Sequence, residues 1–145
     1  MFRKMLLAAL VVSFSSGVAH AAVKTKVVEY KYNGTTLKGY LAWDDAVRSK
    51  RPGVLVVHEF WGLNGYARKR AEQIAELGYV AFAADMYGDG KTTEHPKEAG
   101  QMAGEVRKNI KTWQGRGLAA LKVLQDNELV DGKRLAAIGY CFGGS

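Results

Sequence analysis

The sequence predicts an α/β protein, built on a mostly parallel sheet that an antiparallel hairpin precedes. Short apolar runs alternate along the chain with amphipathic segments, and most of these runs lack the polar–apolar alternation of a half-exposed strand. Of the 145 residues, 48% are hydrophobic, 24% are charged and 2 are proline, which excludes the disordered and collagen-like classes. A single compact domain is therefore expected.

The predicted strands follow from residue type and turn chemistry. Residues 23–32 and 35–43 are rich in β-branched and aromatic side chains, and Asn33-Gly34 between them favours a type I′ hairpin turn. The run 53–57 lacks alternation and predicts a strand buried on both faces of a parallel sheet, and the runs 79–84 and 134–140 predict two further parallel strands.

Two helices are predicted from apolar residues at helical spacing. Asn64 is a suitable N-cap for the first, and Gly78 ends it. Pro96 suits the first turn of the second, whose apolar stripe runs from Ala99 to Leu124. We expect this long helix to be kinked or broken at Gly115-Arg-Gly117 because glycine is a poor helix former.

The N-terminus has the pattern of a secretory signal peptide. Arg3 and Lys4 precede the apolar run 6–14, and Ala19-His20-Ala21 is a small-x-small cleavage site. We expect cleavage after Ala21, a periplasmic or secreted protein, and one domain over residues 22–145. No later segment offers the roughly 20 apolar residues of a membrane span, so no membrane association is expected after cleavage.

Charge and cysteine content exclude further classes of function. The net charge of +7 arises from lysines and arginines that are interspersed rather than clustered, which argues against nucleic-acid binding. The single cysteine, Cys141, cannot form an intramolecular disulfide or a cysteine-rich zinc site. We expect no metal and no cofactor.

Cys141 stands where a nucleophile elbow would hold its nucleophile. Gly139 and Gly143 flank it in a G-x-Cys-x-G pattern directly after a predicted strand, as a tight strand-to-helix turn requires. The backbone N–H of Phe142 would then face a developing oxyanion. A buried, inert thiol is the alternative interpretation; a phosphate loop is disfavoured because the lysine of that motif is missing.

Three segments at predicted strand ends carry a family resemblance: His58-Glu-Phe-Trp-Gly-Leu-Asn64, Ala84-Asp-Met-Tyr-Gly88 and Gly139-Tyr-Cys-Phe-Gly-Gly144. Together they resemble the dienelactone hydrolase family of α/β-hydrolases, over essentially all of residues 22–145. The resemblance implies a three-layer α/β-hydrolase sandwich. It also implies a Cys-His-Asp triad that cleaves an ester or lactone, a small-molecule substrate, through a thioester.

The same resemblance assigns roles residue by residue. Cys141 matches the nucleophile, and Glu59 matches a glutamate that helps to generate the thiolate. Phe60 and Phe142 match the positions whose N–H groups form the oxyanion hole. From the residues alone, Glu59 is either a solvated surface carboxylate or an active-site group with a perturbed pKa.

Other residues near the strand ends have less specific roles. We expect His58 to be a structural or oxyanion-loop histidine rather than the base, since the base of an α/β-hydrolase follows the nucleophile in the chain. Trp61 and Tyr87 are candidates for an apolar substrate pocket. Gly88-Asp-Gly-Lys91 stands where dienelactone-cleaving members carry an arginine for the substrate carboxylate, and Lys91 could replace it only as a point charge.

The triad cannot be completed within the sequence. Neither aspartate nor histidine occurs after Asp131, so the triad Asp and His are expected beyond residue 145 and the chain is expected to be the N-terminal portion of a longer domain. The alternative is a non-catalytic binding or interaction protein of α/β-hydrolase ancestry. The residues specify neither one ester or lactone nor an oligomeric state.

Overall fold

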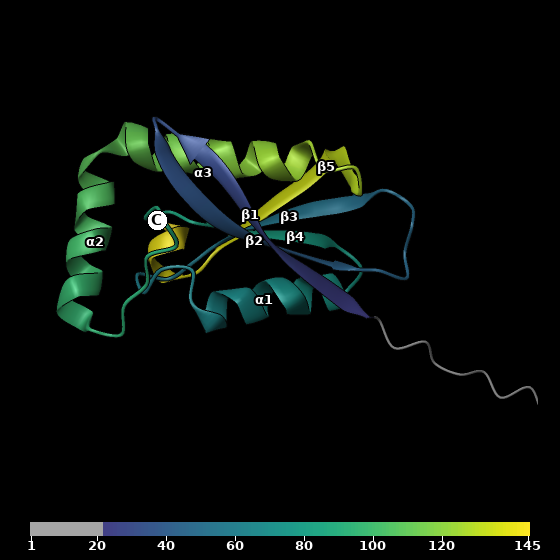
Figure 1. Ribbon diagram of the computed structural model, residues 1–145, viewed down its shortest axis with the longest axis horizontal. Helices are drawn as coiled ribbons and strands as arrows, with labels where there is room; N and C mark the ends of the chain where they lie inside the picture. Colours follow the sequence, from purple (N-terminus) through teal and green to yellow (C-terminus); the bar gives the residue numbers. More distant parts are fainter. Residues whose placement is uncertain (1–21) are drawn as a thin grey trace, which may run out of the picture.

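The computed structural model describes residues 22–145, so the predicted signal peptide and its cleavage site at Ala21 lie outside the described residues. Figure 1 shows a central sheet between two helical layers. Helix α3 (Ile110–Gln125) covers one face, α1 (Gly65–Glu76) covers the other, and α2 (Pro96–Lys108) stands across one end. The three-layer α/β arrangement predicted from the sequence is confirmed.

Five strands form one mixed sheet in the spatial order β1-β2-β4-β3-β5. Their bounds are Val23–Tyr32 (β1), Thr35–Asp44 (β2), Arg51–Val57 (β3), Val80–Ala84 (β4) and Val130–Gly139 (β5). Strands β1, β2 and β4 pair antiparallel, whereas β4, β3 and β5 run parallel. The carboxyl ends of the three parallel strands therefore meet at one end of the sheet, the usual ligand-binding end of such folds.

The β1–β2 hairpin has the turn that its sequence predicts. Asn33 and Gly34 both have positive φ, 46° and 76°, as the two central residues of a type I′ turn require. Tyr32 pairs with Thr35 directly beside this two-residue turn. The pairing then continues without a shift to Val23 and Asp44.

Side-chain size differs between the two faces of the sheet. The core under α1 is built mainly from alanine: Ala42, Val56, Leu63, Ala67, Ala71, Ala75, Ala81 and Ala83. Small side chains on both surfaces allow the helix to lie close to the strands. On the α3 face, larger residues such as Phe82, Leu55 and Leu124 fill the space.

The helix boundaries confirm the predicted N-cap of α1 and the predicted proline in the first turn of α2. The Asn64 side chain accepts a hydrogen bond from the Ala67 N–H at 3.2 Å, and Pro96 occupies the first turn of α2. Gly78 follows the end of α1 with φ 91°, a left-handed conformation that costs glycine little.

The predicted break at Gly115-Arg-Gly117 is wrong. The stripe is divided into α2 and α3 at Asn109, whose side chain accepts a hydrogen bond from the Thr112 N–H at 3.1 Å and caps α3. Both glycines lie inside α3. A Cβ on Gly115 would overlap the Tyr32 ring, so this glycine serves the close approach of β1.

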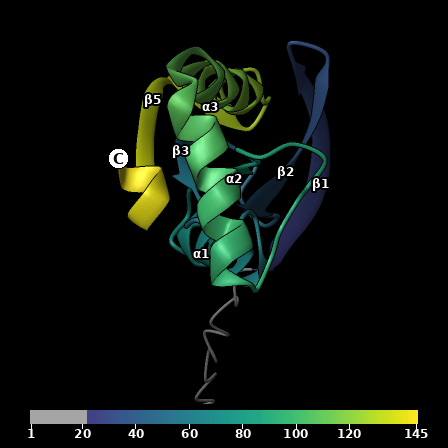
Figure 2. The same cartoon turned by 90° about the vertical axis from the view of Figure 1, so that its left-hand side faces the viewer.

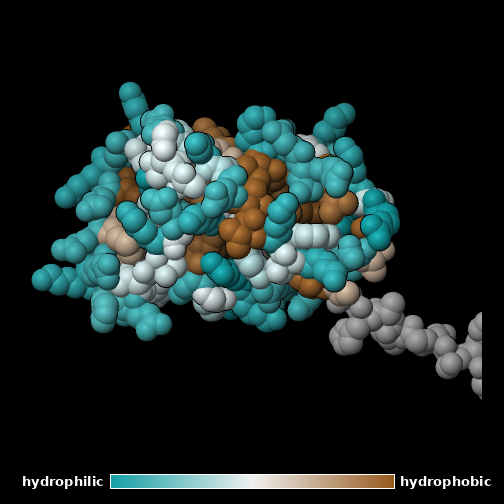
Figure 3. Space-filling model, viewed as in Figure 1, coloured by the Kyte–Doolittle hydropathy of each residue, from teal (hydrophilic) through white to brown (hydrophobic). Residues whose placement is uncertain are grey.

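The surface of residues 22–145 is mostly hydrophilic, with a few exposed apolar groups. Figure 3 shows hydrophobic side chains emerging near the middle of the face where β1 and β2 cross, and Val27 on β1 is 49% exposed. Within this part of the chain, no helix combines the length and the apolar character needed to cross a membrane. At the far edge of the sheet, β5 pairs on one side only, with β3.

Candidate active site

The turn after β5 places Cys141 at the carboxyl end of the parallel strands. Figure 2 looks at this end, where α2 crosses in front of the sheet and the C-terminal turn lies beside it. Cys141 is exposed and has φ 51°, a left-handed conformation that non-glycine residues rarely adopt. Residues 141–144 form a single 3₁₀ turn. The strand-terminal thiol is therefore presented to solvent on a tight turn, not buried as an inert core thiol.

Both flanking glycines are required by contacts with backbone atoms. A Cβ on Gly139 would overlap the Gly143 carbonyl group. A Cβ on Gly143 would lie 2.5 Å from the Val57 carbonyl oxygen and 2.8 Å from that of His58. The Tyr140 N–H also donates to the Val57 carbonyl at 3.1 Å. The turn around Cys141 is thus packed directly against the end of β3, as an elbow motif requires.

Phe142, directly after the cysteine, is buried in a stack of rings. Its ring is nearly parallel to that of His58, with centroids 5.7 Å apart, and to that of Trp113, at 4.8 Å. Tyr87 packs beside it at 5.5 Å, and the Arg107 guanidinium lies 5.2 Å from the ring centroid. These contacts, from the ends of β3 and β4 and from α2 and α3, hold the elbow on its inner side.

His58 is completely buried, and both its ring nitrogens have partners. Its Nε2 accepts a hydrogen bond from the Met86 N–H at 3.2 Å, and its Nδ1 lies within hydrogen-bond distance of the Glu59 carbonyl oxygen. Burial lowers the pKa of the imidazole, so the neutral form is favoured. The ring has no nitrogen left to receive the thiol proton, in agreement with a structural role.

The loop after β3 carries the other predicted site residues. Glu59 is half-buried, and the rings of Phe60 and Trp61 are in contact, with centroids 4.3 Å apart. The Tyr87 hydroxyl donates to the Phe60 carbonyl at 2.9 Å. Among residues 22–145, no hydrogen bond joins the Glu59 carboxylate to the Cys141 thiol.

Several backbone N–H groups at this end of the sheet have no acceptor within residues 22–145, and those of Phe60 and Phe142 are among them. One precedes Trp61 in the loop after β3, and the other follows the cysteine in the elbow. Backbone N–H groups of this kind are nearly always paired unless solvent or a ligand receives them. They are therefore available to an incoming oxygen atom.

Asp85, which the sequence places in the Ala84–Gly88 motif without a role of its own, organises the loop after β4. Its buried carboxylate accepts four backbone N–H groups at 2.8–3.0 Å: those of Lys38, Tyr87, Gly88 and Gly90. Positive φ values at residues 88–90 turn the loop around this carboxylate. The signal was present as an acidic residue directly after a buried strand, followed by two glycines.

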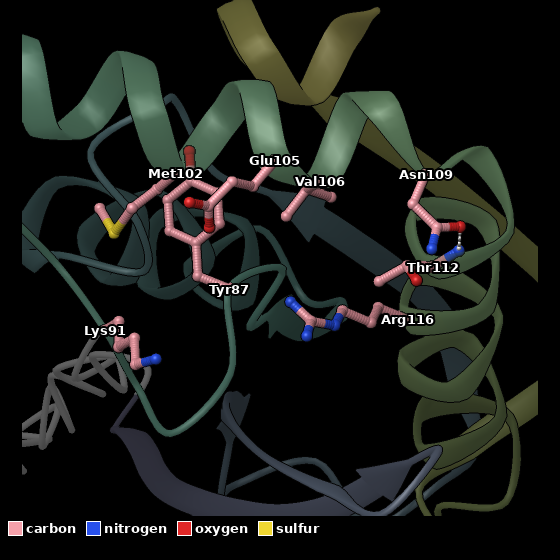
Figure 4. A pocket seen from close by; sticks show the side chains of 8 residues that line it. All are labelled: Tyr87, Lys91, Met102, Glu105, Val106, Asn109, Thr112 and Arg116. Atoms are coloured by element: carbon pink, nitrogen blue, oxygen red, sulfur yellow. Dashed lines mark hydrogen bonds between the residues drawn. The ribbon is translucent and has the colours of Figure 1, made fainter.

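A cavity of about 290 Å³ lies beside Tyr87 (Figure 4). Its lining residues are Tyr87, Lys91, Met102, Glu105, Val106, Asn109, Thr112 and Arg116. Arg116, which the sequence analysis did not single out, donates to the Met86 carbonyl at 2.7 Å, and its buried Nε has no partner. Cys141 does not line this cavity; Tyr87 connects the two, since its ring also contacts Phe142.

The two predicted pocket residues do not share a cavity. Trp61 lines a second cavity of about 250 Å³, together with Asn64, Thr93 and Glu94. Phe60 contacts both residues, through its carbonyl with Tyr87 and through its ring with Trp61. Within the described part of the chain, no group of three His, Cys, Asp or Glu side chains is arranged to hold a metal ion.

The chain is similar in sequence to several known proteins. The chain is 30% identical to the protein usf of Aquifex pyrophilus over 83% of its own length and 52% of that protein. It is 29% identical, with the same coverage, to an Aquifex aeolicus relative named for carboxymethylenebutenolidase activity. The chain thus spans about half the length of these curated relatives.

Solved structures agree with this relationship. A structure named m3DLH is 40% identical with a TM-score of 0.81, covering 85% of this chain and 51% of the other. A dienelactone hydrolase-like promiscuous phosphotriesterase from metagenomic libraries is 37% identical with a TM-score of 0.80, covering 84% and 51%. A sequence profile of the Dienelactone hydrolase family matches residues 37–145. With the elbow, the three-layer sheet and this match together, the chain belongs to the dienelactone hydrolase family.

Proposed function

We propose that Cys141 is the nucleophile of an ester or lactone hydrolase. The observation that carries this proposal is an exposed thiol on a left-handed elbow that packs against the end of β3, with the N–H groups of Phe60 and Phe142 lacking an acceptor within residues 22–145. A thiolate is a strong nucleophile, and paired N–H donors are what a tetrahedral oxyanion requires. The family membership supports hydrolysis as the reaction class.

The proposed reaction follows from these groups. The Cys141 thiolate attacks the carbonyl carbon and forms an S–C bond, while the carbonyl π electrons move to oxygen. The Phe60 and Phe142 N–H groups donate to that oxyanion. When it collapses, the C–O bond to the leaving alkoxide breaks and a thioester remains, which water then hydrolyses to the acid and the free thiol.

Glu59 is proposed to assist in forming the thiolate, since this half-buried residue directly follows the end of β3, against which the elbow packs. The triad Asp and His are proposed to lie beyond residue 145. Trp61 and Tyr87 are proposed to contact the substrate, each from its own cavity. Export to the periplasm or the medium, with cleavage after Ala21, is proposed from the N-terminal sequence alone and is tested by the N-terminal sequence of the mature protein.

The decisive experiment uses Cys141→Ala and Cys141→Ser in the full-length gene product. Hydrolysis of p-nitrophenyl acetate is expected to fall to the rate of buffer in Cys141→Ala, while the thermal melting curve stays unchanged. In the wild-type protein, mass spectrometry of the quenched reaction is expected to find one acetyl group on Cys141. Hydrolysis by Cys141→Ala at the wild-type rate would overturn the proposal.

The non-catalytic alternative gives a different result in the same experiment. A binding protein of hydrolase ancestry would show neither acetylation of Cys141 nor ester turnover in the wild-type protein. Treatment with iodoacetamide provides the control, because it reports whether the thiol is accessible and ionised without requiring an oxyanion site.

A further inference from the structure

The hydrogen bonds of His58 define its tautomer. A backbone N–H can only donate, so the Nε2 that faces the Met86 N–H carries no proton. The neutral ring then bears its proton on Nδ1, which donates to the Glu59 carbonyl oxygen. Complete burial supports the neutral form. The imidazole is therefore fixed in one orientation, as a donor to the loop after β3.

The Glu59 carbonyl belongs to the same peptide unit as the Phe60 N–H. A peptide is planar and trans, so fixing the direction of its C=O fixes the opposite direction of its N–H. The same carbonyl also accepts from the Gly62 N–H at 3.3 Å. Donors to a carbonyl oxygen polarise the amide and strengthen its N–H as a donor. The Phe60 N–H has no acceptor within residues 22–145. The two hydrogen bonds to the Glu59 carbonyl therefore both orient this N–H and polarise it.

His58 also packs against the ring of Phe142, the residue that carries the second N–H. The two rings are nearly parallel, with an interplanar angle of 12°, and the Trp113 ring also stacks on Phe142 at 4.8 Å between centroids. The His58 carbonyl meanwhile packs against Gly143 of the elbow. One buried side chain therefore lies between the two segments that carry the unpaired N–H groups.

We propose that His58 is a positioning residue for the oxyanion hole: its Nδ1–H aligns the Phe60 N–H, and its ring holds Phe142 in place. The proposal rests on the function proposed above, in which Cys141 acylates. His58 forms no bond to the substrate and transfers no proton. Its contribution is to keep both donors in the direction of the oxyanion before the substrate arrives.

Two conservative variants separate the two hydrogen bonds of the ring. In His58→Asn, the side-chain amide nitrogen can replace Nδ1 as the donor to Glu59, but nothing reaches Met86. In His58→Gln, the longer side chain can accept from the Met86 N–H, but it places no donor at the Glu59 carbonyl. The pair thus varies the contact that the proposal requires while keeping a polar, uncharged side chain at the same site.

Two reactions of Cys141 distinguish positioning from general structural support. Acetylation by p-nitrophenyl acetate passes through an oxyanion, whereas alkylation by iodoacetamide displaces iodide and forms none. In the full-length protein, we expect His58→Gln to lower the acetylation rate about 10- to 100-fold, less than complete loss of a donor, with alkylation unchanged. His58→Asn is expected to acetylate at least about tenfold faster than His58→Gln, because it keeps the donor.

Three outcomes would overturn the proposal: wild-type acetylation in both variants, a slower His58→Asn than His58→Gln, or a parallel loss of acetylation and alkylation in both. If either variant fails to fold, proton–nitrogen correlation NMR of the wild-type protein replaces the kinetics, and a proton on Nε2 instead of Nδ1 would refute it. Failure of the proposed function is recognised separately, by ester hydrolysis that survives Cys141→Ala.

Discussion

The Tyr87 hydroxyl donates a hydrogen bond to the Phe60 carbonyl at 2.9 Å and so joins the loops that follow β4 and β3. Burial raises the pKa of this hydroxyl well above its usual range, so it remains a donor at every physiological pH. The ring of the same residue packs on His58 and Phe142. Tyr87 thus supports the proposed oxyanion loop from a second strand.

Tyr87→Phe removes this hydrogen bond and keeps the ring packing. We expect the free energy of unfolding to fall by about 1 kcal/mol, since the Phe60 carbonyl loses a partner in a largely buried site. Urea denaturation measures this change. Tyr79→Phe is the matched control: Tyr79 is 39% exposed, and its variant is expected to stay within about 0.5 kcal/mol of wild type. Equal effects of the two substitutions would contradict this role of Tyr87.

Asp85→Asn is expected to be strongly destabilising. The amide that replaces the carboxylate has one acceptor oxygen for four backbone N–H groups, so about two buried donors lose their partner. A loss of about 3 kcal/mol or more in the free energy of unfolding follows. Asp89→Asn, at an exposed position with φ 54° that asparagine tolerates, is expected to be nearly neutral. A mild effect at Asp85 would show that solvent replaces these hydrogen bonds.

The two glycines of α3 are expected to respond to alanine in opposite directions. Gly117→Ala meets no atom within 4 Å and should raise the free energy of unfolding by about 0.5–1 kcal/mol through helix propensity. Gly115→Ala would displace the Tyr32 ring and break its 2.9 Å hydrogen bond to the Lys111 carbonyl, so a loss of about 1 kcal/mol is expected. Urea denaturation of both variants tests the contrast, which a gain at Gly115 would disprove.

The buried His58 should make stability depend on pH. Its pKa in the folded protein lies below the ordinary value of 6.5, because burial penalises the imidazolium. As the pH falls below 6.5, the imidazole of the unfolded chain binds a proton that the folded protein excludes. The contribution of neutral His58 to the free energy of unfolding is therefore fully present above pH 6.5 and decreases as the pH falls toward the pKa of the folded protein. Unfolding in urea at about pH 7.5 and about pH 5.5 measures the loss. In His58→Gln, the difference in the free energy of unfolding between these two pH values should be smaller than in the wild type. An unchanged difference would show that groups other than His58 cause the pH dependence.

The elements that the sequence predicts well are those with a local physical cause. Asn33-Gly34 specifies its turn through backbone conformation, and Asn64 and Pro96 mark helix starts through hydrogen bonding and a fixed φ. The elbow is predictable for the same reason, because a Cβ at Gly139 or Gly143 would overlap backbone atoms.

The features that the sequence did not predict depend on distant partners. Gly115 looks like a helix breaker until the Tyr32 ring is placed against it. Asp85 resembles an ordinary loop acid, because one of its four donors, Lys38, comes from 47 residues earlier in the chain. Arg116 lines a cavity only because the break at Asn109 brings α3 beside the loop after β4.

The packing of Gly143 against the Val57 and His58 carbonyl groups has a consequence for tolerance to sequence change. The contact is made by main-chain atoms of the last residue of β3 and of the residue after it, so no exchange of side chains at 57 or 58 can create room for a larger residue at 143. A compensating second mutation is therefore unavailable within that strand. In a library that samples all residues at positions 57 and 143, position 57 should accept several aliphatic replacements for valine, whereas position 143 should accept glycine alone.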